Sequence, residues 1–96
     1  MKELCSAAFL KWGRETQINK LQEESLELAL AINQHNCPTK NKKELEDKIY
    51  DELADVKIMM CQAENFLFDK DRIDERVKFK LNRMREKYFQ DIDPIK

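Results

Sequence analysis

Glycine and proline are scarce in this sequence, which contains one Gly and two Pro among its 96 residues. Sheets joined by tight turns depend on these two residue types, so their scarcity argues against a β-rich fold. Leu, Ala, Glu, Lys and Gln, which favour helices, make up much of the chain instead. The composition therefore predicts an all-α protein, and the length allows a single domain over residues 1–96.

Long apolar runs and an excess of one charge are also missing. No stretch approaches the roughly 20 apolar residues that cross a membrane, and the N-terminal residues hold no apolar core long enough for a signal peptide. Charged residues are 39% of the chain, but the formal net charge is only −1, so no overall field favours nucleic acid or an anionic membrane. Cys5, Cys37 and Cys61 share no CxxC spacing, which argues against disulfides and zinc. We therefore expect a cytoplasmic protein without nucleic-acid or membrane partners.

The first half of the chain predicts a long helix over residues 16–34, because apolar side chains recur there every three or four positions. A shorter helical segment is expected before it, over residues 2–12, with Gly13 as a break between the two. Residues 33–41 are predicted to form a loop. Asn41 is suited to cap the helix that follows.

The next predicted helix, over residues 42–68, is apolar on two sides. Its two apolar stripes are Ile49, Leu53, Val56, Met60, Ala63 and Leu67, and Tyr50, Ala54, Ile58, Cys61 and Phe68. A helix that is apolar nearly all round must be covered on several sides, which two other helices of one small subunit can hardly do. We therefore expect a bundle of three main helices, plus the short N-terminal segment, completed by oligomerisation into a homodimer or a dimer of dimers.

A third helix is expected to begin at Asp69 or Asp71. Its predicted core stripe is Ile73, Val77, Leu81, Met84 and Tyr88. A second stripe, rotated away from the core, carries Lys78, Asn82 and Arg85. These three side chains could donate to phosphate oxygens, or they could form an ordinary solvated basic face.

Two carboxylate pairs are the most informative feature of the chain. Glu24 with Glu27, and Glu52 with Asp55, each place two acids on one helix face within a strongly apolar stretch. Four carboxylates converging at about 5 Å would repel one another by roughly 3 kcal/mol per pair at an effective dielectric near 20. A divalent cation would relieve this repulsion. The alternative is a half-exposed charged stripe paired with lysines.

The acidic run Glu23-Glu24-Ser25-Leu26-Glu27, followed by Glu52-Leu53-Ala54-Asp55, resembles the EExxE…ExxD signature of MazG-like nucleoside triphosphate pyrophosphohydrolases. Trp12-Gly13 followed by Gln17 is similar to the short phage or prophage type of this family. Lys78, Asn82 and Arg85 match a KxxxNxxR pattern similar to the family's phosphate-handling helix. The resemblance covers roughly residues 10–90. It implies an all-α enzyme that cleaves a nucleoside triphosphate, (d)NTP, to the monophosphate and pyrophosphate with magnesium.

The resemblance, together with the positions of the residues on the predicted helices, gives expected roles for individual residues. The expected metal ligands are Glu24, Glu27, Glu52 and Asp55, which suit Mg²⁺ because this ion prefers oxygen ligands, and Mn²⁺ could replace it. Glu23 is the expected general base, with a further ligand or a surface acid as alternatives. The expected substrate-binding residues are Lys78, Asn82, Arg85, Gln17 and Lys20. For Lys20, an ion pair with Glu24 is an equal alternative.

Two other functions fit the same sequence. Phosphoribosyl-ATP pyrophosphatases are similarly short and have related acidic motifs. A helical interaction protein with a decayed site is the alternative outside enzymes, although all four acids are present. For the base, Phe9, Trp12 and Phe66 are candidates for stacking, with core packing as the favoured interpretation.

Overall fold

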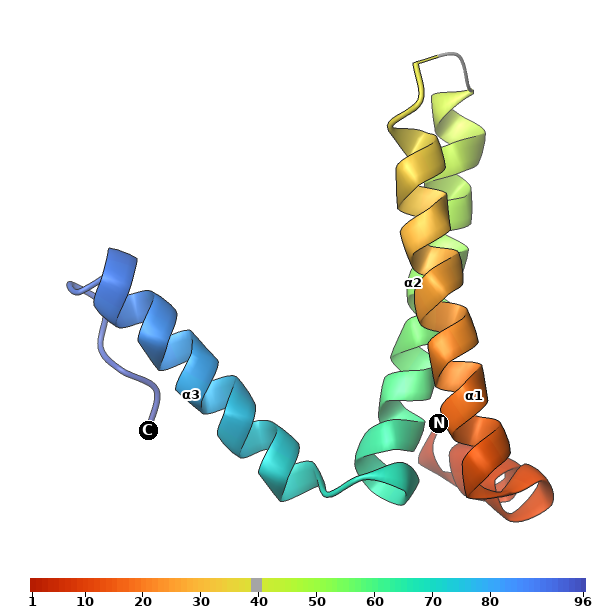
Figure 1. The fold of residues 1–96 in the computed structure, drawn as a ribbon, viewed down its shortest axis with the longest axis horizontal. Helices are drawn as coiled ribbons and strands as arrows, with labels where there is room; N and C mark the ends of the chain where they lie inside the picture. Colours follow the sequence, from red (N-terminus) through yellow and green to blue (C-terminus); the bar gives the residue numbers. More distant parts are fainter. Residues whose placement is uncertain (39–40) are drawn as a thin grey trace.

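The computed structural model describes residues 1–38 and 41–96 and confirms the all-α class. Its elements are α1 (Lys2–His35), α2 (Lys42–Gln62), a π-helical turn η1 (Ala63–Leu67) and α3 (Lys70–Tyr88). The helices α1 and α2 lie side by side as a long antiparallel hairpin, and α3 points away from it, so that the chain has the shape of an open V (Figure 1). Positions 39 and 40 of the predicted loop lie outside the described residues.

The break expected in the first helix is confirmed at Gly13. Its backbone angles are φ 82° and ψ 170°, a conformation that residues with a Cβ rarely adopt. The break lets residues 2–12 turn back and pack against η1, where the Phe9 and Phe66 rings stack with their centroids 5.7 Å apart. This contact agrees with the core-packing interpretation of these two rings.

Replacing Gly13 by Ala should therefore destabilise the fold by about 1–3 kcal/mol, as strained backbone conformations of this kind do. No other atom lies within 4 Å of a Cβ built at this position, so the effect comes from the backbone alone. A synthetic chain with D-alanine at position 13 is the control, because its Cβ tolerates positive φ, and it should unfold like the parent in urea. Equal stability of the Gly13→Ala chain would contradict the strained conformation.

The start of α2 agrees with the prediction from sequence, but its end does not. The Asn41 side chain accepts hydrogen bonds from the backbone N–H groups of Lys43 (3.1 Å) and Glu44 (3.3 Å), as expected for a cap. The α-helix ends at Gln62, however, and the chain continues as one π-helical turn, closed by a bond of 2.9 Å from the Phe68 N–H to the Ala63 carbonyl. Helical periodicity alone does not distinguish these two forms over a single turn.

The third helix begins where Asp69 caps it, with its carboxylate accepting from the N–H groups of Asp71 (2.9 Å) and Arg72 (3.3 Å). This settles the choice between the two predicted starts. None of the residues of α3 is buried, and among the described elements only η1 has Cα atoms within 8 Å of those of α3. The stripe predicted to lie in the core is therefore mostly open to solvent in a single copy: Ile73 is half-buried, but the stripe residues that follow it are exposed, Val77 at 49%.

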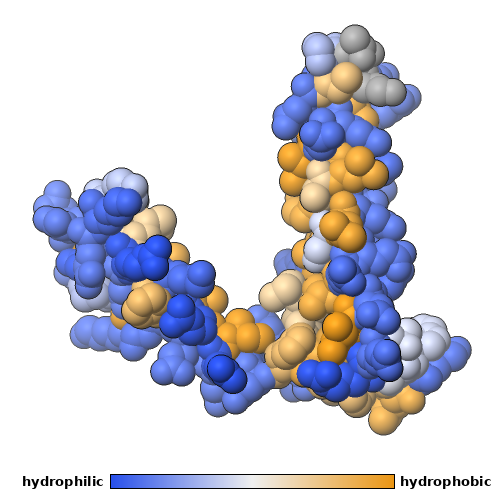
Figure 2. Space-filling view, viewed as in Figure 1, coloured by the Kyte–Doolittle hydropathy of each residue, from blue (hydrophilic) through white to orange (hydrophobic). Residues whose placement is uncertain are grey.

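The core of the described chain is small. The buried residues are Cys5, Gln17, Glu24, Ala31, Met59, Gln62, Ala63 and Leu67. Apolar surface instead lies along the hairpin and on the part of α3 nearest to η1 (Figure 2). None of the described helices is both long enough and apolar enough to cross a membrane.

Candidate metal centre

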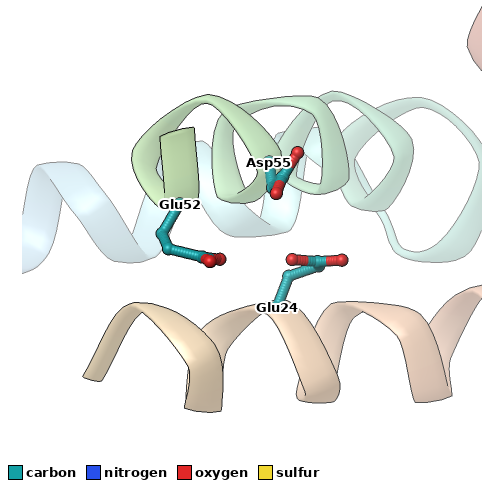
Figure 3. A group of neighbouring side chains, drawn as sticks. All are labelled: Glu24, Glu52 and Asp55. Carbon is teal, nitrogen blue, oxygen red and sulfur yellow. The ribbon is translucent and has the colours of Figure 1, made fainter. Parts of the chain in front are cut away.

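Three of the four predicted ligands come together between α1 and α2. Glu24 extends from α1 toward Glu52 and Asp55 on α2 (Figure 3), and each offers one carboxylate oxygen within 4.8 Å of the other two. The helices are held in this register by a buried hydrogen bond of 2.9 Å from Gln62 Nε2 to Gln17 Oε1. Gln17 lies seven residues before Glu24, and Gln62 lies seven residues after Asp55. Because the two helices are antiparallel and seven residues are about two helical turns, pairing of the two Gln side chains also brings Glu24 opposite Asp55.

The three acids differ in exposure, and two of their oxygens lack partners. The Glu24 side chain is only 7% exposed, Glu52 is half-buried and Asp55 is exposed. Within the described chain, no group donates a hydrogen bond to the buried Oε2 atoms of Glu24 and Glu52. A buried acceptor left without a donor is costly, more so when it is charged. Carboxylate oxygens that accept no hydrogen bond are free to bind a cation, and Mg²⁺ and Mn²⁺ prefer oxygen ligands.

Glu27, the fourth predicted ligand, lies outside this group of three. Its carboxylate still responds to the others, because the charge of Glu24, partial burial, and the charges of Glu52 and Glu23 raise the pKa of Glu27 above its ordinary value. Glu27 thus lies at the edge of a strongly negative site. A cation bound there would reduce the repulsion it experiences.

Removing the charge of Glu27 should make the metal-free protein less sensitive to pH. Because the pKa of Glu27 is raised in the folded chain, its stabilising contribution is present below the ordinary value of 4.5 and is lost as the pH rises through the raised value. Glu27→Gln does not titrate, so its free energy of unfolding in urea with EDTA should fall less than the parent's between about pH 4 and pH 7. Glu46→Gln, which removes an exposed acid on α2, is the control. A parent-like pH dependence of Glu27→Gln would contradict the assignment.

Lys20 and Glu23 lie beside the cluster. Lys20 Nζ is 2.9 Å from Glu24 Oε1 and 3.7 Å from Glu23 Oε1, and the hydrogen bond and charge of Glu24 raise the pKa of Lys20. The ion pair offered as the alternative for Lys20 is therefore present. Glu23 has an exposed side chain, 57% accessible, so its carboxylate can reach solvent water next to the site.

Gln17, expected among the substrate-binding residues because it lies on the Glu24 stripe, is buried in the structure. It is 6% exposed and its side chain is bonded to Gln62. Gln62 was not identified from the sequence as a functional candidate. The sequence feature that could have pointed to Gln62 is its position seven residues after Asp55, the same spacing that separates Gln17 from Glu24.

The basic stripe of α3 is not brought to the acids of its own chain. Asn82 exchanges hydrogen bonds with the backbone of Ile95, at 3.0 Å and 2.8 Å. Arg85 donates to the carbonyl groups of Gln90, at 3.1 Å, and Ile92. Lys78 lies on the same helix, whose Cα atoms do not come within 8 Å of those of α1 or α2 in the described residues. Any shared site of these residues and the acids therefore needs a second copy or a movement of α3.

The chain matches no protein-family model, no curated protein and no solved structure.

Proposed function

We propose that this chain is a Mg²⁺-dependent nucleoside triphosphate pyrophosphohydrolase that converts a (d)NTP to the (d)NMP and pyrophosphate. The observation that carries the proposal is the group of three acids on two helices, in which two buried carboxylate oxygens have no donor among the described residues. A solvated charged stripe, the alternative interpretation, would leave such oxygens in water. Mn²⁺ should replace Mg²⁺, because both accept carboxylate ligands.

In this proposal Glu24, Glu52 and Asp55 hold the metal, with Glu27 at the edge of the site. The bound cation would neutralise charge on the triphosphate and acidify a water. Attack of a water on the α-phosphorus would break the bond from this phosphorus to the oxygen that bridges to the β-phosphorus, so that pyrophosphate would leave. The carboxylate of Glu23, which is exposed next to the site, would accept the proton of that water.

The proposal includes assembly of the chain with itself. The accessible surface is 7831 Å², whereas a compact monomer of 11.5 kDa exposes about 5,800 Å². The radius of gyration is 17.0 Å, against about 12.5 Å for a compact chain of this length. The excess of roughly 2,000 Å² is more than the ~800 Å² that each partner of a standard interface buries. A homodimer or a dimer of dimers would cover it.

Assembly would also explain where the basic stripe acts. Since the Cα atoms of α3 stay more than 8 Å from those of the acid-bearing helices of its own chain, Lys78, Asn82 and Arg85 would serve the acids of a neighbouring copy. Their cationic and amide groups suit phosphate oxygens, and Arg85 can bind two oxygens at once. For this role Asn82 and Arg85 would exchange their present backbone partners for phosphate.

The direct test is pyrophosphate release, with magnesium, from a panel of ribonucleoside and deoxyribonucleoside triphosphates and phosphoribosyl-ATP. We expect release from at least one nucleoside triphosphate and none with EDTA. Release from phosphoribosyl-ATP alone would favour that related activity instead. Failure on every substrate would favour a helical interaction protein with a decayed site.

A further inference from the structure

Two cysteines that are far apart in the sequence lie together in the fold. Because the chain turns back after residues 2–12, Cys5 borders a small cavity at the end of α2 together with Met59 and Gln62. Both of these α2 residues lie within two positions of Cys61 in the sequence. Cys5, at 4% exposure, is therefore buried against the turn of α2 that carries Cys61.

The stacked rings of Phe9 and Phe66 fix the register of this contact, with their centroids 5.7 Å apart. Cys5 lies four residues before Phe9, about one α-helical turn. Cys61 lies five residues before Phe66, which is the i→i+5 spacing of the π-helical turn η1. One turn back from the ring stack, along both segments, therefore leads to the two cysteines.

The two thiols interact directly, and they differ in access to solvent. Burial raises the pKa of the Cys5 thiol above its ordinary value of 9.0, and a hydrogen bond with Cys61 and the charge of the Cys61 thiolate raise it further. Asn65 Nδ2 donates to the Cys61 carbonyl (2.7 Å) and to Cys61 Sγ (3.5 Å), which restrains the Cys61 side chain. Cys61 is only half-buried, so a small oxidant reaches its sulfur before that of Cys5.

We propose that Cys5 and Cys61 form a redox-sensitive pair, which hydrogen peroxide converts to an intramolecular disulfide. The Cys61 thiolate attacks the peroxide and breaks its O–O bond; Cys61 becomes a sulfenic acid, and the hydroxide released takes up the proton that Cys61 gave up. The Cys5 sulfur then attacks the Cys61 sulfur. The S–O bond breaks, and hydroxide leaves as water with the proton of Cys5. The two sulfurs lose two electrons, and the peroxide becomes two waters.

The disulfide would tie residues 2–12 to α2. In the reduced chain, noncovalent contacts such as the ring stack hold this segment. A link between positions so distant in sequence restrains the unfolded chain and thereby stabilises the fold. Oxidation would thus keep the N-terminal segment docked. The competing explanation is that the two thiols only pack together, as buried cysteines commonly do.

The test treats the folded parent protein with equimolar hydrogen peroxide. We expect the mass of the intact chain to fall by about 2 Da, because two hydrogens are lost, and a non-reducing digest should contain the Cys5 peptide joined to the Cys61 peptide. The equilibrium constant for unfolding in urea should fall roughly 30- to 900-fold, which corresponds to the usual effect of one disulfide. A thiol reductant should reverse both changes.

The third cysteine supplies the matched control. Cys37→Ser keeps the proposed pair and should form the same link at the parent rate. Cys5→Ser removes the second sulfur, so Cys61 should remain a sulfenic acid that dimedone labels. The digest of the parent needs no substitution, so it decides the question even if Cys5→Ser fails to fold.

Three results would each overturn the pair. They are a link that includes Cys37, a link between two chains in place of the one within a chain, and a mass gain from oxygen without loss of hydrogen. A Cys5–Cys61 link that forms as fast in urea as in the folded chain would also overturn it, because the fold would then not bring the sulfurs together. None of these measurements uses nucleotide hydrolysis, so their failure leaves the proposed function untouched, and an inactive parent leaves this inference untouched.

Discussion

Replacing Glu52 by Gln should lower the turnover of the parent enzyme roughly 100- to 1,000-fold, the effect expected when one preorganised electrostatic group is lost. Glu52 belongs to the group of three acids, and its buried Oε2 has no donor among the described residues. The substitution keeps the size of the side chain and removes the charge that would hold the cation. Pyrophosphate release at saturating substrate measures the effect, and Glu46→Gln, on the same helix but outside the cluster, should keep parent turnover.

The same variant should lose its response to metal. At a free Mg²⁺ concentration 100 times the dissociation constant, the parent should gain roughly 2.7 kcal/mol of stability, because the cation relieves repulsion among the acids. Urea unfolding with Mg²⁺ and with EDTA gives this difference directly. Glu52→Gln should show a much smaller one. Identical unfolding curves of the parent in the two conditions would rule out a metal site of this strength.

Two impaired chains should restore activity when they are mixed and assayed below the Michaelis constant. One carries Glu52→Gln, which damages the acids, and the other carries Lys78→Ala with Arg85→Ala, which damages α3. If α3 serves the acids of a neighbouring copy, each mixed pair has one site in which the acids of one chain and the α3 of the other are both intact. Equal amounts refolded together should recover about one quarter of parent activity, since half of the pairs are mixed and each mixed pair has one working site of two.

The mixing experiment has a built-in control for assembly. Different affinity tags on the two chains report how many mixed pairs form. Mixed pairs without recovered activity would show that α3 acts on the acids of its own chain, and the proposed arrangement of the two copies would be wrong. The double variant alone should be weakly active below the Michaelis constant, because phosphate contacts shared by substrate and transition state mainly affect substrate binding.

Local features of this chain were predictable from sequence because their causes are local. The all-α class follows from helical periodicity and from the scarcity of glycine and proline. The cap at Asn41 and the break at Gly13 each depend on the side chain or backbone freedom of one residue. The spacing of Glu24 from Glu27 and of Glu52 from Asp55 likewise determined which acids share a helix face.

Tertiary structure decided which of these side chains meet. Glu27 shares the face of Glu24, yet only Glu24 lies within 4.8 Å of both Glu52 and Asp55, because the register of α1 against α2 sets the distances across the hairpin. Gln17 lies on that face too, but it is buried where residues 2–12 fold back.

For α3 as well, the sequence determined the helix and tertiary structure decided its surroundings. Its sequence determined a helix with an apolar stripe and a basic stripe, since both patterns repeat with the helical turn. Its direction depends on the short connection through η1 and the Asp69 cap, which turns it away from the hairpin. Hydrophobic periodicity identifies a face that must be covered; only the arrangement of the helices in space shows that its own chain leaves that face open.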